Sequence, residues 1–453
     1  MFNPAILDPS DNTAQPNATF AWRAGKPISK SDLLNASSIL VDKISQYDHV
    51  INICGERLNF SYGFLAALLS QSITVLPPNS QKGTIRSISK NFENYCVLVD
   101  SDDFRDIRHA IDVRMFKLNS VDELHSIQRP TLTVDPEALA AIAFTSGSTG
   151  EPKAQEKKWR TLFGTAALLG ERFSASIENK GQINVLATVP SQHMYGLEMT
   201  LLMALQNAWS VSSRRPFFPT DIAEALHEIP APRILVTTPV HLRALLGSGV
   251  TLPKIEKIVS ATAPLSKELA VQAELMFDTR VYEIYGCTEA GSLATRRTAE
   301  DDEWHLLEGI KLSLRGNDTY VSGKHLSGEA LLNDVISMTD TQYFRLQGRC
   351  GDLINVAGKR ASLAELNEKL LAISGVDDGV VFMNKKNGEK ESRTAALVVA
   401  KNISDSEIMK ALSETVDPVF LPRPLKLVDA LPRSATGKLP TKALMEFLQS
   451  VSS

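Results

Sequence analysis

Two kinds of hydrophobic pattern alternate along the first three quarters of the chain. Short apolar runs rich in β-branched residues, typical of buried strands, are followed by turn residues and then by segments with apolar residues at three-and-four spacing. Residues 221–229 and 241–246 show the helical pattern. Strands that alternate with helices predict an α/β fold of mainly parallel sheets covered by helices. The runs expected to form strands include Val50–Ile53, Thr74–Leu76, Val97–Val99, Ile142–Phe144, Ile234–Val236 and Lys257–Val259.

The pattern changes near residue 349. Beyond it come a short apolar run, a helix that begins at Ser362, strands at 380–382 and 395–399, and another helix. Ser362 with Glu365 three residues later predicts a capping box. A chain of 453 residues is too long for one compact core, and about a hundred residues is a common size for an independent unit. We therefore expect a large domain at 1–348 and a small, mobile α+β domain at 349–453.

Composition excludes several classes of protein. A net charge of −4 gives no electrostatic footprint for nucleic-acid binding, and no apolar run approaches the roughly twenty residues that span a bilayer. The four cysteines are scattered, without the spacing of a zinc site or a disulfide framework, and no secretory signal is visible. These features favour a cytoplasmic protein that acts on small molecules or on another protein.

The most informative segment is TSGSTGEPK at 145–153, which directly follows a buried-strand pattern. Backbone N–H groups and hydroxyls in such a loop converge on an anion, and the lysine adds positive charge. No Gly-Lys-Ser/Thr sequence closes the loop, which disfavours a kinase or NTPase of the Walker type. The residues expected to bind phosphates are Thr145, Ser146, Gly147, Ser148, Thr149, Gly150 and Lys153.

This segment resembles the phosphate loop of the adenylate-forming superfamily, which includes acyl-CoA and aryl-CoA synthetases, luciferases and adenylation domains of nonribosomal peptide synthetases. Three further motifs follow in the family's order, so the resemblance runs from about residue 141 to 438. The sequence VPSQHMYGL at 189–197 is similar to the segment beside the family's acyl pocket. The resemblance implies that His193 gates the substrate or the pyrophosphate path, and that Met194 and Tyr195 line the acyl pocket.

The third motif is a pair of segments, SATAPL at 260–265 and YGCTE at 285–289. In the family the first lines the adenine face and the second wraps the nucleotide, with its aromatic ring on the adenine. A carboxylate beside a phosphate loop adds repulsion unless Mg²⁺ bridges the two, so Glu289 is the expected metal ligand. Thr288 is expected to donate a hydrogen bond to the phosphoryl oxygen or the carboxylate. The resemblance assigns Thr262, Ala263, Pro264, Tyr285 and Gly286 to the nucleotide, and Ala261 and Cys287 to the acyl pocket.

The fourth motif spans the expected domain boundary, with GR at 348–349, GKR at 358–360 and LPRSATGK at 431–438. The resemblance places Arg349 and Arg360 in the nucleotide site. It also implies that Lys438 is the catalytic lysine, which reaches the α-phosphate and the carboxylate.

Two aspartates compete for the role of the family's ribose-binding residue. The spacing back from Gly348 favours Asp334, whereas Asp340 looks like the aspartate of a hairpin turn. Gly351 stands at the family's hinge position, and glycine tolerates the large dihedral changes that a hinge needs.

These motifs imply ATP-dependent activation of a carboxylic acid. Attack by the carboxylate on the α-phosphate gives an acyl-AMP whose leaving group is AMP, and the acyl group then passes to a thiol. The chain's shortness and the segments 192–198 and 260–266 resemble the compact ligases of aryl polyene and xanthomonadin-type pigment pathways. Those enzymes load a hydroxybenzoate, here of the 4-hydroxybenzoate type, onto the phosphopantetheine thiol of an acyl carrier protein.

Two alternatives remain open. An aryl- or medium-chain acyl-CoA ligase would use free CoA in place of a carrier protein. A catalytically silent nucleotide-binding regulator is the alternative of a different class. The joint presence of Lys153, Thr288, Glu289, Asp334 and Lys438 argues against that regulator.

Overall fold

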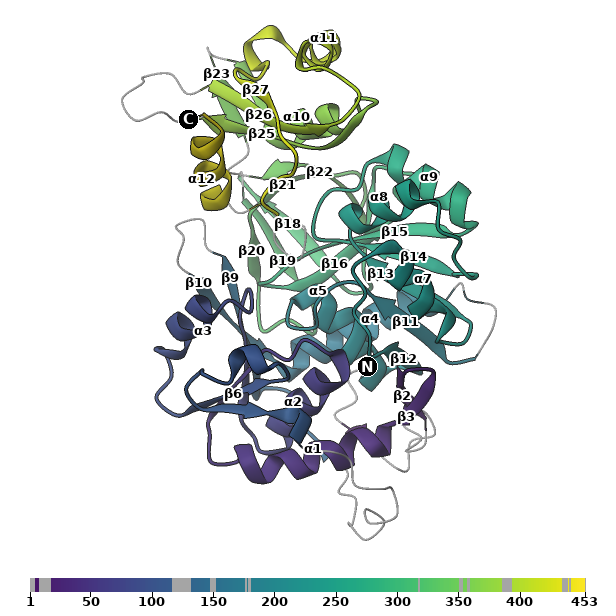
Figure 1. The fold of residues 1–453 in the computed structure, drawn as a ribbon, viewed down its shortest axis with the longest axis vertical. Coiled ribbons are helices and arrows are strands. Elements are labelled where there is room, and N and C mark those ends of the chain that lie inside the picture. The colour runs from purple at the N-terminus through teal and green to yellow at the C-terminus, as the bar shows by residue number, and fades with distance from the viewer. Residues whose placement is uncertain are drawn as a thin grey trace.

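Two bodies of unequal size make up the molecule (Figure 1), a large α/β body and a smaller α+β body near the C-terminus. The computed structural model describes residues 5–7, 18–115, 132–146, 152–175, 177, 181–316, 318–349, 353–356, 359–384, 393–433, 439 and 441–452. Within them, no helix is long and apolar enough to cross a membrane.

The largest sheet has eleven strands in the described part of the chain. Its centre, from β15 to β2, is parallel, and the strands at both ends pair antiparallel. In spatial order the strands are β21 (Asp334–Met338), β22 (Tyr343–Arg349), β17 (Trp304–Leu306), β16 (Gly291–Arg296), β15 (Arg280–Cys287), β14 (Lys257–Ser260), β13 (Arg233–Thr237), β11 (Ile183–Ala187), β12 (Trp209–Ser212), β2 (Thr19–Arg23) and β3 (Lys26–Ser29).

A second sheet of six strands is parallel except for the pair β9–β10. Its order is β10 (Pro152–Lys158), β9 (Leu139–Ser146), β5 (Ile73–Leu76), β4 (His49–Asn52), β6 (Tyr95–Val99) and β7 (Ala110–Asp112). The strands and helices that the apolar pattern predicts in the large body are confirmed, as is the mainly parallel character of both sheets.

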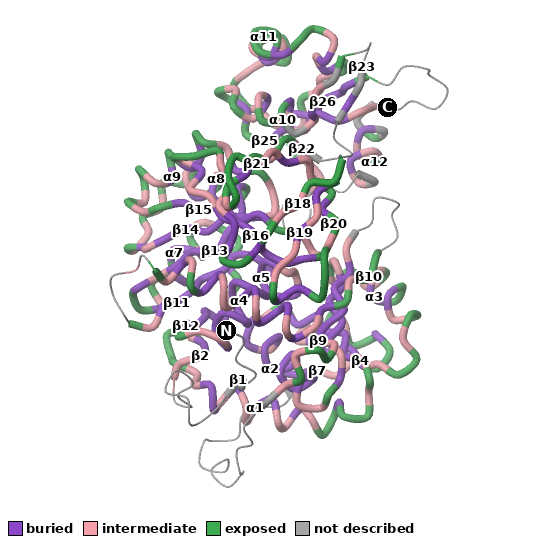
Figure 2. Tube along the Cα trace, turned by 180° about the vertical axis from the view of Figure 1, so that it is seen from behind, coloured by how far each residue is buried: buried purple, intermediate pink, exposed green. Residues whose placement is uncertain are grey.

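Helices cover both faces of the largest sheet because its central strands are apolar on both faces. Leu235 and Ile258 pack with α7, α8 and α9, whereas their neighbours Ile234 and Val259 pack in the main core with α4 and η4. Figure 2 shows these central strands as mostly buried, whereas α7, α8 and α9 also carry exposed positions on their outer sides. The helices are α1 (Lys30–Ile44), α2 (Arg57–Leu69), α3 (Lys82–Ser89), α4 (Trp159–Ser174), α5 (Met194–Leu197), the π-helical η4 (Glu198–Leu202), α6 (Met203–Gln206), α7 (Pro219–His227), α8 (Pro239–Ser248) and α9 (Lys267–Phe277).

Smaller elements complete the large body. A three-stranded antiparallel sheet is formed by β18 (Lys311–Arg315), β19 (Asp318–Ser322) and β20 (Ala330–Leu332). The remaining elements are β1 (Ala5–Leu7) with β8 (Leu132–Thr133), and the 3-10 turns Asp102–Phe104 and Val113–Met115.

The smaller body has its own apolar core, which lies between α10, α11 and the strands β25 and β26. The strand pair predicted in this region is confirmed. Whether the domains divide between residues 348 and 349 stays a prediction, although β22 belongs to the largest sheet and β23 pairs with β24 outside it. The elements are β23 (Leu353–Val356), β24 (Lys359–Ser362), α10 (Leu363–Leu371), β25 (Val376–Asn384), β26 (Arg393–Ala400), α11 (Asp405–Thr415), the 3-10 turn Pro418–Phe420, β27 (Leu425–Leu427) and α12 (Thr441–Ser452).

The capping box predicted at the start of α10 is wrong. Ser362 is the N-cap residue, but its side chain makes no capping hydrogen bond. The Ser362 side chain is buried, and its Oγ lies 2.6 Å from the point where a Cβ on Gly348 would stand, so it faces β22. Glu365 pairs with Lys369 at 2.7 Å and does not return to the cap.

Candidate functional site

The phosphate-loop segment joins two paired strands at one end of the six-stranded sheet. β9 and β10 are antiparallel, with Lys153 opposite Thr145 and the Thr145 hydroxyl 3.4 Å from the Lys153 carbonyl oxygen, to which it donates. The Lys153 side chain is exposed at this end. Residues 147–151 and the side chain of Ser146 lie outside the described residues. The phosphate binding that the sequence predicts for Gly147, Ser148, Thr149 and Gly150 therefore stays a prediction.

A buried lysine connects this loop strand to the YGCTE segment. Lys157 on β10 donates a hydrogen bond from Nζ to the backbone carbonyl oxygen of Glu289 at 2.7 Å. Burial lowers the pKa of Lys157. The Glu289 side chain is exposed and Thr288 is half-buried, at the turn between β15 and β16. Two residues 132 positions apart in sequence are thereby held together, as the family resemblance implies.

The structure brings Tyr285 and Asp334 into direct contact. The Tyr285 hydroxyl donates to Asp334 Oδ2 at 2.8 Å. The Tyr285 ring is buried and packs against Trp304 and Phe344, with centroid separations of 5.6 and 5.5 Å. Asp334 begins β21, and this hydrogen bond joins its carboxylate to the aromatic residue of the YGCTE segment.

Asp340 lies in a different part of the structure from Asp334. It is exposed in the turn between β21 and β22, where its Oδ1 accepts the Thr341 backbone N–H at 2.5 Å. The expectation that Asp340 belongs to a hairpin turn is confirmed. The assignment of Asp334 to the ribose remains a prediction, and its position beside Tyr285 is the geometry that the assignment requires.

The segment that follows β14 is fixed to the next strand by a hydrogen bond to a buried carboxylate, which also forms an ion pair. Glu283 on β15 accepts the backbone N–H of Leu265 at 3.0 Å and pairs with Arg296 at 2.7 Å. Burial raises the pKa of Glu283. Within this segment Ala261 is buried, Ala263 is half-buried and Pro264 is exposed, and Thr262 has a φ of +80°, in the left-handed region that costs a β-branched residue free energy.

The loop that carries His193 is held from beneath by a buried arginine. Arg57 of α2 donates hydrogen bonds to the Ala187 and Val189 carbonyl oxygens at 3.0 and 3.1 Å, to Ser191 Oγ at 2.8 Å and to Thr200 Oγ1 at 3.2 Å. Burial lowers the pKa of Arg57 to about 9. These contacts fix the path of the chain from β11 to α5.

The predicted acyl-pocket residues come from the carboxyl ends of neighbouring strands, where ligands bind in open α/β sheets. His193 is the half-buried N-cap residue of α5, followed by half-buried Met194. The buried Tyr195 hydroxyl donates to the Val259 carbonyl oxygen at 2.8 Å, which ties α5 to β14. Cys287 is half-buried, and desolvation raises its pKa to about 12.

The fourth motif and the hinge hold four predicted residues, of which two are described by their backbone alone and two are not described. Arg349 is opposite Asp334 in the β21–β22 register, and Arg360 is opposite Asn355 in β23–β24; their side chains are not among the described ones. Gly351 and Lys438 lie outside the described residues. The start of the lysine loop is described: Arg433 donates from Nε and Nη2 to the two carboxylate oxygens of Asp378, both at 2.6 Å.

Glu198 is a buried carboxylate that the sequence analysis did not single out. It is 1% exposed and accepts the Ser292 hydroxyl at 2.5 Å. Burial raises the pKa of Glu198 to about 7, against the smaller effects of Ser292 and Lys157. The sequence offers one indication that Glu198 is unusual, because it is the single charged residue in the mainly apolar run 194–205. Arg57 and Glu283 gave no comparable signal.

The raised pKa predicts a pH-dependent stability. Because the folded protein keeps the Glu198 proton to about pH 7 and the unfolded chain loses it near 4.5, the free energy of unfolding should fall as the pH rises through that window. Glu198→Gln removes this slope and should be more stable above pH 7 by about 3 kcal/mol. Chemical denaturation at pH 5 to 8 measures the difference, and the same slope in both proteins would contradict the assignment.

The donor set suits Mg²⁺. Among the described residues no group of three or more His, Cys, Asp or Glu side chains is placed to hold a metal ion. Magnesium is commonly bound through one or two carboxylates together with substrate phosphate oxygens, with no all-protein cage. Glu289 offers one exposed carboxylate at the turn that Lys157 fixes beside the phosphate-loop strand.

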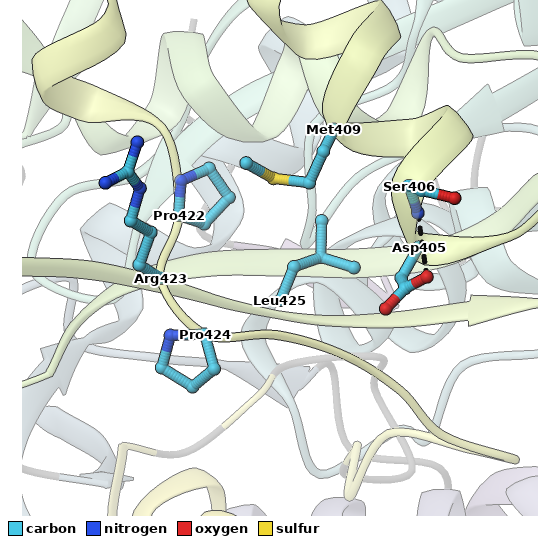
Figure 3. Close-up of a pocket in the computed structure, with 7 residues that line it drawn as sticks. All are labelled: Asp405, Ser406, Met409, Pro422, Arg423, Pro424 and Leu425. Carbon is cyan, nitrogen blue, oxygen red and sulfur yellow. Dashed lines mark hydrogen bonds between the residues drawn. The ribbon is translucent and has the colours of Figure 1, made fainter.

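A hollow of about 230 Å³ lies elsewhere, on the smaller body (Figure 3). Asp405, Ser406 and Met409 of α11 line one side, and the segment 422–425 lines the other. It contains none of the predicted site residues, and we assign it no part in the reaction.

Comparisons with known proteins agree with this arrangement. Residues 31–328 match the family described as AMP-binding enzyme. The 3,4-dihydroxybenzoate–[aryl-carrier protein] ligase of Bacillus anthracis is 23% identical over 325 residues, 68% of this chain and 74% of that protein. The 4-coumarate–CoA ligase of Pinus taeda is 23% identical over 371 residues, 72% of this chain and 69% of that protein.

Among solved structures, the o-succinylbenzoate coenzyme A synthetase of Bacillus subtilis in complex with ATP and magnesium ion has the same fold. Its TM-score is 0.77 at 19% identity, over 95% of this chain and 97% of that one. The matched segment includes the phosphate loop, the His193 loop and the β15–β16 hairpin, and the fold is that of a large N-terminal domain with a smaller C-terminal one. The chain therefore belongs to the family of AMP-binding enzymes, and it is an AMP-forming acid–thiol ligase.

Proposed function

We propose that this ligase adenylates a small aromatic acid, a hydroxybenzoate of the 4-hydroxybenzoate type, and transfers the acyl group to the phosphopantetheine thiol of an acyl carrier protein. The pathway is the synthesis of an aryl polyene-type pigment. The observation that carries the adenylating part is the β15–β16 hairpin, which is bound to the loop strand through Lys157 and to Asp334 through Tyr285. A nucleotide bound along this hairpin would lie beside the loop strand and Asp334.

The chemistry requires two anions to meet, so the protein's task is positioning and neutralisation of charge. In the proposed reaction, Asp334 holds the ribose and the segment 145–153 holds the departing pyrophosphate. Glu289 would hold Mg²⁺, which supplies positive charge at the phosphates. Lys438 reaches the α-phosphate and the acid. The small domain then turns about Gly351, which removes Lys438 and opens a path for the thiol.

The choice of acid and acceptor rests on the relatives. The Bacillus anthracis ligase is named for a dihydroxybenzoate and an aryl-carrier protein, which supports both halves of the proposal. The Pinus taeda ligase is named for CoA, which is the basis of the second candidate, an aryl-CoA ligase. A carrier protein adds surface contacts that free CoA lacks, so we expect the carrier to be the better acceptor.

The test is acid-dependent exchange of labelled pyrophosphate into ATP. We expect strong exchange with 4-hydroxybenzoate and weak exchange with dodecanoate, followed by faster thioester formation with holo carrier protein than with CoA at equal concentration. A preference for dodecanoate would reject the aromatic substrate. If none of the acids supports exchange, adenylation is rejected and the silent nucleotide-binding regulator remains.

Glu289→Gln should raise the Mg²⁺ concentration needed for half-maximal exchange, because the variant loses the carboxylate charge that holds the metal. The apparent affinity for the acid should change little. Glu303, a carboxylate directly before β17, is a control, and Glu303→Gln should leave the titration unchanged. A magnesium titration that is the same for Glu289→Gln and the unmodified enzyme would remove Glu289 from the metal site.

A further inference from the structure

A buried lysine joins the two large sheets beside the candidate nucleotide site. Lys157 lies on β10, the end strand of the six-stranded sheet, and is 2% exposed. Its Nζ donates at 2.7 Å to the backbone carbonyl oxygen of Glu289, in the turn between β15 and β16 of the eleven-stranded sheet. In the described part of the chain this is the one hydrogen bond of the Lys157 ammonium group. Lysine is seldom so fully buried unless it is paired, so a main-chain oxygen is an unusual partner for it.

The turn that Lys157 holds is short. Cys287 is opposite Gly291 in the register of the hairpin, so Thr288, Glu289 and Ala290 alone make the connection. Gly291 has a φ of +79°, the left-handed conformation in which three-residue hairpin loops commonly end. Because a peptide unit is planar, a hydrogen bond to the Glu289 carbonyl oxygen restrains the backbone on both sides of that bond. It thereby restrains the direction in which the exposed Glu289 side chain leaves the turn.

The same strand carries the lysine of the phosphate-loop segment. Lys153 and Lys157 are four residues apart on β10, so their side chains lie on the same face of the strand. Lys153 is exposed at the loop end, whereas Lys157 is buried against the hairpin. One face of β10 therefore carries a lysine expected to contact phosphate and a lysine bonded to the backbone of the expected Mg²⁺ ligand.

We propose that Lys157 is a positioning residue, which holds the Glu289 carboxylate in the direction in which it binds the magnesium ion of MgATP. This inference rests on the proposed role of Glu289. Magnesium demands near-ideal octahedral geometry, so a carboxylate on a loosely held turn binds it poorly. Residues that orient a metal ligand from behind commonly change metal affinity by about 10- to 100-fold when they are replaced.

The test measures metal binding without turnover. Mn²⁺ replaces Mg²⁺, and its dissociation constant is measured by electron paramagnetic resonance with a non-hydrolysable ATP analogue and no acid. Lys157→Met keeps the aliphatic stem but removes the ammonium group, and should raise this dissociation constant by about tenfold or more. In pyrophosphate exchange, the Mg²⁺ concentration for half-maximal rate should rise by a similar factor, whereas the KM for the acid should change little.

Lys257→Met is the matched control. Lys257 is 3% exposed, and its Nζ donates at 2.7 Å to the Phe173 carbonyl oxygen, at the amino end of β14. Ligands of open α/β sheets bind at the other end of the strands. The control therefore loses the same kind of buried hydrogen bond away from the site, and its Mn²⁺ dissociation constant should not change. If both variants change this constant to the same extent, the role of Lys157 is structural alone and the inference is overturned.

The double variant Lys157→Met with Glu289→Gln tests whether Lys157 acts through Glu289. If it does, Lys157→Met should weaken Mn²⁺ binding little further once the carboxylate is gone, because residues that act as one unit are not additive. Independent effects that multiply would overturn the inference. If Glu289→Gln weakens binding and Lys157→Met does not, the inference alone fails. If Glu289→Gln binds Mn²⁺ as the unmodified protein does, the proposed role of Glu289 fails as well.

Discussion

Lys438→Ala is expected to abolish adenylate formation while largely preserving thiol transfer from supplied acyl-AMP. Lys438 is proposed to neutralise the two anions only in the first half-reaction. Removing such stabilisation commonly costs about 3 kcal/mol or more, which is a loss of at least about 100-fold in rate. The loop that carries it begins at Arg433, which Asp378 holds through two hydrogen bonds, so its first residues are fixed to β25.

The two half-reactions separate this role from a general defect. Pyrophosphate exchange reports the first, and thioester formation from synthetic acyl-AMP reports the second. Lys410 is an exposed lysine on α11 of the same body, and Lys410→Ala should keep both rates. Equal losses in the two half-reactions of Lys438→Ala would contradict the proposed role.

Arg57→Met should destabilise the fold by at least about 3 kcal/mol, because it leaves several buried acceptors without a donor. The methionine fills much of the space but donates nothing to the Ala187 and Val189 carbonyl oxygens. The His193 loop then loses its support. We therefore expect weaker acid-dependent exchange even at a temperature where the variant is fully folded.

Chemical denaturation measures the stability loss. Arg86→Met is the matched control, since Arg86 pairs with Asp106 on the surface and its side chain is 61% exposed. Such surface pairs contribute about 0–1 kcal/mol. If the two variants lose similar free energies of unfolding, the buried hydrogen bonds of Arg57 do not have the importance assigned here.

Much of the fold could be predicted from hydrophobic periodicity because the parallel strands are apolar on both faces. Runs such as 234–236 are short, β-branched and bounded by turn residues, and all of them are strands in the structure. The capping box at Ser362 could not be predicted correctly, because a local spacing says nothing of a strand that packs beside it. In the structure the Ser362 side chain faces Gly348 of β22 and makes no capping hydrogen bond.

The candidate site, like the fold, could be predicted from the sequence only in part. Motifs in one stretch of sequence identified the loop, the hairpin and Asp334, and the geometry brings the described members together. Arg57 and Glu198 could not be identified from the sequence, because each forms its hydrogen bonds with partners far away in the chain. The acceptors of the Arg57 hydrogen bonds lie at least 130 residues away in the sequence, and Ser292, which donates to Glu198, lies 94 residues away.

The N-terminal hairpin has a practical consequence for anyone who expresses only the matched segment, which begins at residue 31. β2 and β3 cap one end of the largest sheet, and Trp22 donates from its indole N–H to Asn184 and Ser210. A protein shortened to that segment would present β12 as a bare edge, with its backbone N–H and C=O groups free to pair with another molecule. Such edges promote aggregation, so the shortened protein should precipitate where the full chain stays in solution.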